Sequence, residues 1–206
     1  MKRKITFLML ILLIAGLTVR GQVEKGSLFV NGLNILTFQA GSIKSTYLNE
    51  ADSKSTFTSF SIGPYTSIPS LSTAPSLNYG FTNKLTGGIF VNLTSMSEKE
   101  DVKYTSTGFM FGPCLRYYLT DQKKCLPFIE GHLGIGTSSS KYGTGTSDKS
   151  NLFGWHLGTG ATYFFTPKVG ADFSLGYENI ADKLKSSDHK TTYRYFQFGM
   201  GILVVF

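Results

Sequence analysis

The chain has 206 residues, of which 20 are Lys or Arg and 13 are Asp or Glu, so its formal charge is +7. Its 23 glycines lack a three-residue period and its aromatic content is 14%, which excludes collagen-like and disordered chains, while two cysteines exclude a disulfide framework. Charged residues reach only 16%, against about 25% in a typical soluble domain, yet the mean hydropathy of +0.01 is too low for a helical membrane protein.

The N-terminal region, residues 1–21, predicts a secretory signal peptide. Residues 2–4 are basic, residues 5–17 are almost wholly apolar, and small or modest residues precede a cut before Gln22. An uncleaved anchor is the alternative, but an apolar run of about 13 residues is short of the roughly 20 that a spanning helix needs. Cleavage leaves a mature domain, residues 22–206, with a charge of 16 − 13 = +3. This lower charge removes the main argument for a nucleic-acid partner.

Eight segments of the mature chain alternate large apolar residues with small or polar ones, which is the pattern of a β-strand between two environments. The first segment is the weakest and places Phe29, Leu33 and Ile35 on one face. The second places Leu71 on the same apolar face as Leu77. The predicted strands are residues 26–38, 70–81, 85–94, 107–119, 125–137, 153–165, 168–178 and 192–206.

The predicted connections alternate in length. Short turns lie at residues 81–84, 120–124 and 166–167, and longer polar loops lie at residues 39–69, 96–105, 138–150 and 179–190. This order predicts an all-β fold, an eight-stranded antiparallel up-and-down barrel. The longest connection contains apolar residues of its own, so it either extends the flanking strands or folds over the mouth of the barrel.

The two faces of the strands differ in a way that favours a membrane barrel. The apolar face carries almost no charge in the middle of any strand, whereas the other face carries Gly, Ser, Asn and a few charged residues, as in a transmembrane barrel with a polar lumen. We expect a polar network in that lumen, made of Arg116, Glu130, His132 and Asp172. The alternative is a secreted soluble barrel that binds a small apolar ligand, with its large apolar residues pointing inward.

The C-terminal strand ends in an aromatic residue that follows four apolar residues on the same face. This pattern resembles the recognition signal by which bacterial outer-membrane barrels dock onto the barrel-assembly machinery. The residues of this predicted assembly signal are Phe198, Met200, Ile202, Val204 and Phe206.

Together with strand and turn segments such as residues 74–85 and 112–118, this ending makes the chain resemble the small outer-membrane β-barrel proteins, the OmpX-like and OmpA-transmembrane-like group of the porin family. The resemblance implies insertion into a bacterial outer membrane after export, with both termini in the periplasm and with membrane lipid as a partner. It implies little about activity, because this fold carries adhesins, structural proteins, narrow channels and lipid-modifying enzymes.

We therefore expect a monomer with a non-enzymatic role: envelope integrity, adhesion to an extracellular partner through the four long loops, or narrow solute passage. The enzymatic alternative is a lipid A acyl-chain reaction in which His132 or His156 is the base and Ser174 the nucleophile. Three scattered histidines and two cysteines have no metal-ligand spacing, so we expect no metal and no cofactor. Cys114 and Cys125 flank a predicted turn, and export to an oxidising periplasm would permit a disulfide between them. Strict alternation places them on opposite faces, which opposes this pairing unless the turn is bulged, so the sequence leaves the disulfide open.

Overall fold

The computed structural model describes residues 23–46, 52–62, 70–99, 103–121, 124–143, 145 and 147–206; the predicted signal peptide and its cleavage site lie outside these residues. Within the described ranges, no helix is long and apolar enough to cross a membrane. The strands are β1 (Leu28–Thr46), β2 (Ser53–Ile62), β3 (Ser76–Gly80), β4 (Leu85–Lys99), β5 (Lys103–Tyr118), β6 (Cys125–Tyr142), β7 (Ser147–Phe164), β8 (Val169–Leu184) and β9 (Lys190–Val205).

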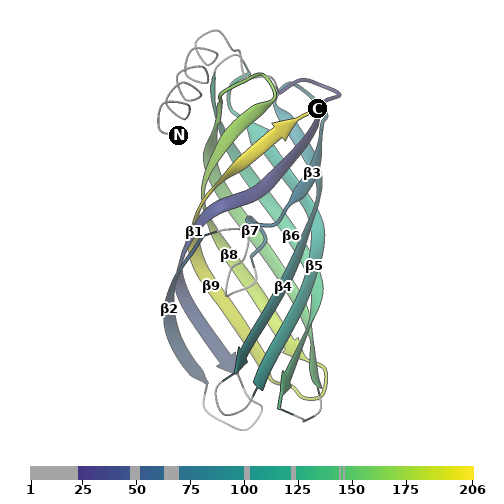
Figure 1. Cartoon of the computed structure of the whole chain (residues 1–206), viewed down its shortest axis with the longest axis vertical. Helices are drawn as coiled ribbons and strands as arrows, with labels where there is room; N and C mark the ends of the chain where they lie inside the picture. The colour runs from purple at the N-terminus through teal and green to yellow at the C-terminus, as the bar shows by residue number, and fades with distance from the viewer. Residues whose placement is uncertain are drawn as a thin grey trace, which may run out of the picture.

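All neighbouring strands pair antiparallel, and the sheet closes on itself. From β3 to β9 each strand pairs with the next one in the sequence, and β9 returns to pair with β1, from Phe29 opposite Val205 to Thr46 opposite Lys190. Figure 1 shows the result, a barrel of tilted strands in which the purple first strand and the yellow last strand run side by side. The predicted eight-stranded up-and-down transmembrane barrel is confirmed.

The second position of the ring is shared by two strands. β2 pairs with residues 36–45 of β1, and β3 pairs with residues 28–31 of the same strand. Among the described residues β2 has no other strand partner, whereas β3 also pairs with β4. Before β3, residues 70–74, which we call the inward segment, lie away from the wall and are largely buried inside the barrel.

The outer wall is apolar over a continuous belt, as the alternation predicts. On every strand of the ring, large apolar side chains point outward; Leu93 is 69% exposed and Leu157 is 64% exposed. Their polar neighbours, such as Arg116 and Glu130, are buried. The secreted soluble barrel is therefore contradicted, because it requires the large apolar side chains to lie inside.

The first strand departs from the predicted alternation. Phe29 is 1% exposed, whereas Ile35 is 44% exposed, so the prediction that they share a face is wrong. The register of β1 against β9 shifts between Val30 and Leu33 and again between Asn34 and Leu36, with Gly32 at a φ of 79°. Each extra residue in such a bulge reverses which residues face inward. The side chain of Leu33 is not among those described.

The prediction of long loops at residues 96–105, 138–150 and 179–190 is also wrong. The flanking strands extend into all three. β4 ends at Lys99 and β5 begins at Lys103, β6 ends at Tyr142 and β7 begins at Ser147, and β8 ends at Leu184 and β9 begins at Lys190. Within residues 39–69, β1 and β2 likewise extend into the predicted loop, which confirms strand extension there; residues 47–51 and 63–69 lie outside the described residues. The physical reason is that a strand beyond the apolar belt has water on both faces, so its sequence loses the alternation that marks a membrane strand.

Candidate functional site

The lumen contains an ionic network in the half of the barrel that holds the C-terminus. Arg116 on β5 donates to Glu130 on β6, with Nη2 2.8 Å and Nε 3.1 Å from Oε2, and its Nη1 lies 2.6 Å from Oδ2 of Asp172 on β8. The guanidinium also lies over the ring of Phe128, 3.8 Å from its centroid. Such charge-assisted bonds fix the side chains, because a buried charge is costly without partners.

Two histidines continue this network. Oε2 of Glu130 is 3.6 Å from Nε2 of His132, and Oε1 of Glu130 is 3.6 Å from Nε2 of His156. Nδ1 of His156 is 3.4 Å from Oε1 of Glu178 on β8. The strand register accounts for the pairing, because His132 and His156 are direct partners across β6 and β7. The structure thus brings together all four residues of the predicted lumenal network and adds His156 and Glu178.

Glu178 anchors the inward segment. Its carboxylate accepts hydrogen bonds from the backbone N–H of Leu71 at 2.9 Å and of Ser72 at 3.0 Å, and from the hydroxyls of Ser70, Ser72 and Tyr195. The side chain is fully buried. A carboxylate with this many donors holds the turn of chain that would otherwise have unsatisfied N–H groups inside the barrel.

The inward segment also fits the lumen by shape. Leu71 is fully buried, so its predicted place on the lipid face is wrong: the chain has left the wall at this point, and alternation no longer decides where a side chain points. A Cβ placed on Gly134 would lie 3.0 Å from Leu71, and one on Gly154 would lie 3.1 Å from it. These two glycines on β6 and β7 leave the space that the leucine side chain fills.

Apolar side chains fill the lumen on both sides of the ionic network. Around the inward segment, the buried cluster contains Leu71, Ala74, Phe90, Met110, Cys114, Leu152, Ile180 and Tyr195. At the end of the barrel that holds the C-terminus, a second cluster contains Val23, Phe29, Tyr118, Leu126, Phe128, Phe164, Leu203 and Val205. Along the described strands the interior is therefore a packed core, with the inward segment and the ionic network between its apolar ends.

The geometry does not assemble the acyl-transfer site considered from the sequence. Ser174 lies opposite Gly160 and Gly199, whereas His156 lies opposite Glu178, four residues farther along β8. No described hydrogen bond joins Ser174 to either lumenal histidine, and no group of three or more metal-ligating side chains occurs within the described ranges. Cys114 is buried with its Sγ 3.0 Å from Oδ1 of Asn78, Cys125 is exposed, and both thiols are free.

Sequence reasoning missed the inward segment, Glu178 as its anchor and Gln197 beside it. Gln197 donates to Ser72, accepts from Ser70 at 2.9 Å, and accepts from Gln39 at 2.7 Å. Both Glu178 and Gln197 occupy inward positions of their strands, so alternation could have placed them in the lumen. Their shared partner could not be found that way, because the path of residues 70–74 follows no strand pattern.

Several solved structures are similar to this chain. The outer membrane protein OprG from Pseudomonas aeruginosa is 13% identical, with a TM-score of 0.52 over 90% of this chain and 98% of that one. Neisserial surface protein A is 16% identical with a TM-score of 0.46, over 86% of this chain and 99% of that one. Ail, the attachment invasion locus protein of Yersinia pestis, in complex with the heparin analogue sucrose octasulfate, is 14% identical with a TM-score of 0.44, over 85% and 98%.

No protein-family model and no curated protein matches the sequence. At the identity of OprG, the likeness establishes the fold alone. That fold is the small outer-membrane β-barrel of bacteria, which confirms the class that the sequence resembles.

Proposed function

We propose that this protein is exported to a bacterial outer membrane and spans it as a closed barrel with a non-enzymatic role in the cell envelope. Its wall would contribute to envelope integrity, and its projecting strands would present a surface to the outside. The observation that carries the proposal is the packed lumen, in which the inward segment and the ionic network occupy the space that a pore would need.

The proposed orientation follows from the lengths of the strands on either side of the apolar belt. Residues 81–84, 119–121 and 165–168 lie at the same end as the C-terminus, close to the apolar belt, and we assign this end to the periplasm. At the other end the strands continue beyond the belt, and we assign that end to the cell exterior. Recognition by the barrel-assembly machinery through Phe198, Phe206 and the apolar residues between them belongs to the same proposal.

Membrane insertion is tested first. A folded outer-membrane barrel resists detergent at room temperature, so the unboiled protein should migrate differently on a detergent gel from the boiled protein. Fractionation of the mature chain as a soluble periplasmic monomer would contradict insertion.

The closed lumen is tested by conductance in planar bilayers. We expect no steady channel from the wild-type protein, because charged and apolar side chains fill the barrel. Protease protection of the same protein in vesicles is the control for insertion, because it shows that barrels are present in a membrane that does not conduct. A Glu178→Ala variant, which frees the inward segment, serves as the comparison and should show intermittent openings at most. Steady ohmic conductance of the wild type would overturn the closed-lumen proposal in favour of narrow solute passage.

A further inference from the structure

The outer wall changes abruptly from apolar to polar at one height of the barrel. Going toward the proposed exterior, Leu93 is followed on its face by Ser95, and Ile135 is followed by Thr137. The same change separates Phe153 from Asn151 on β7. This line marks where the hydrocarbon of the outer leaflet would end and the lipid headgroups would begin.

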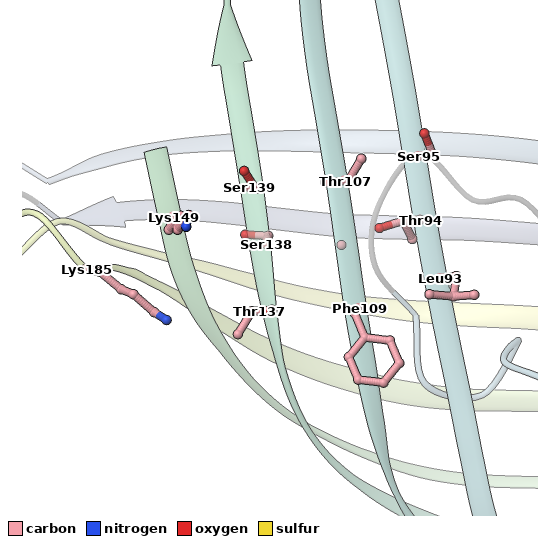
Figure 2. Close-up of a pocket in the computed structure, with 11 residues that line it drawn as sticks. Leu93, Thr94, Ser95, Thr107, Phe109, Thr137, Ser138, Ser139, Lys149 and Lys185 are labelled. Carbon is pink, nitrogen blue, oxygen red and sulfur yellow. The ribbon is translucent and has the colours of Figure 1, made fainter. Parts of the chain in front are cut away.

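A hollow of about 700 Å³ lies on the wall at this line. Figure 2 shows apolar side chains on β4 and β5 at its lower edge, hydroxyl side chains of β4, β5 and β6 across and above them, and two lysines at one side. The residues used below are Leu93, Phe109, Thr107, Ser139, Lys149 and Lys185.

The two lysines are available to a ligand. Lys149 and Lys185 are both exposed, and their strands meet where the backbone N–H of Lys185 donates to the carbonyl of Lys149 at 2.8 Å. Neither lysine forms an ion pair with another described residue. By contrast, Lys44 on the other side of the barrel lies 2.6 Å from Asp52, and this bond lowers the pKa of the Asp52 carboxyl.

The surroundings of the hollow are cationic. Further exposed cations occupy outward positions of β6, β8 and β9: Lys141, Lys183, Lys190 and Arg194. Lys183 and Lys190 are direct cross-strand partners, so two like charges lie side by side on this face. Of the acids nearby, Asp188 pairs with Lys183 at 3.4 Å, whereas Asp182 and Asp148 occupy the inward positions of their strands.

A second hollow, of about 480 Å³, lies in the apolar belt below. Its outward residues include Leu115, Leu133, Trp155 and Leu157 around Gly131, which has no side chain and leaves a notch between them. A groove of this kind on a lipid-facing wall suits an acyl chain. An apolar groove beneath a cationic, hydroxyl-lined hollow matches a lipid with a phosphorylated headgroup.

We propose that this face binds a phosphorylated lipid of the outer leaflet, with its phosphate between Lys149 and Lys185, hydroxyl contacts from β5 and β6, and an acyl chain along the groove at Gly131. A membrane lipid is the source, because the lysines sit directly above the apolar belt, where lipids contact the wall. The proposal rests on the proposed insertion in an outer membrane.

The test is the affinity of the folded protein, in a non-ionic detergent, for bisphosphorylated lipid A, with zwitterionic phosphatidylcholine as the neutral comparison. In a Lys149→Gln/Lys185→Gln double variant, lipid A binding should weaken by up to about 30-fold, since each lysine near a lipid phosphate contributes about a fivefold gain in affinity. The matched control, Lys25→Gln/Lys168→Gln, removes two exposed lysines at the other end and should leave binding unchanged. A Thr107→Trp variant fills the hollow without removing charge and should also weaken binding.

The outcomes separate the proposal from its rivals and from the proposed function. Unchanged affinity in the lysine variant, or an equal loss in the control, overturns the site. Inorganic phosphate or the soluble polyanion heparin binding as tightly as lipid A also overturns it, in favour of free phosphate or a soluble partner. Each variant and the wild type are first run unboiled on a detergent gel. A wild-type protein that shows the normal heat-modifiable shift but does not bind lipid A refutes the lipid site alone. A wild-type protein that shows no such shift refutes insertion itself.

Discussion

Replacing Glu178 with alanine isolates the anchor of the inward segment. The change removes the acceptor for the backbone N–H groups of Leu71 and Ser72, which are 2.9 and 3.0 Å from the carboxylate. A buried donor without a partner costs about 1–3 kcal/mol, so two such donors amount to about 2–6 kcal/mol against the closed position of the segment. The lower bound corresponds to about a 30-fold increase in the population of the form in which the segment is released.

Hydrogen–deuterium exchange of the folded protein in detergent measures this opening directly. We expect the amides of Leu71 and Ser72 to exchange at least about 30-fold faster in Glu178→Ala than in the wild type, because exchange follows the population of the open form. Asp172→Ala is the control: it removes another buried carboxylate, one bonded to Arg116 and not to the segment. Wild-type protection of Leu71 and Ser72 in Glu178→Ala would refute the reasoning that this carboxylate holds the segment.

Two further predictions concern other parts of the lumen. Arg116→Ala leaves the carboxylates of Glu130 and Asp172 buried without their cation and should destabilise the barrel by about 3–5 kcal/mol in urea unfolding from lipid vesicles; a loss below about 1 kcal/mol would contradict the network. A maleimide should label the exposed Cys125 in the folded protein and reach the buried Cys114 only after unfolding, as read by mass spectrometry, and equal labelling of both thiols before unfolding would contradict the packing around Cys114.

The membrane part of this fold is predictable because its physics is local. A strand between lipid and lumen must place apolar residues at every second position, so alternation alone assigns Leu93 to the outside and Arg116 to the inside. The pairing of Arg116 with Glu130 follows as well, because both lie at similar distances from one short turn and the register is antiparallel.

The remaining features depend on contacts that a local pattern does not contain. The bulges of β1 reverse the positions of Phe29 and Ile35 through the register with β9, a strand at the other end of the sequence. The burial of Leu71 depends on space left by Gly134 and Gly154, two glycines on neighbouring strands more than 60 residues away. The strands beyond the belt were missed because water on both faces removes the selection for alternation.

The pairing of β1 with β9 also sets the order in which this chain can fold. Across this pairing the side chain of Gln39 donates a hydrogen bond to that of Gln197, which is 158 residues away in the sequence. The paired part of β1 extends from Phe29 to Thr46. Until β9 is synthesised and delivered, β1 and β8 each keep a row of unpaired backbone groups, which lipid cannot satisfy. The nascent chain must therefore be shielded from aggregation until its last strand arrives, and barrel closure, a contact of very long sequence separation, is expected to limit the folding rate.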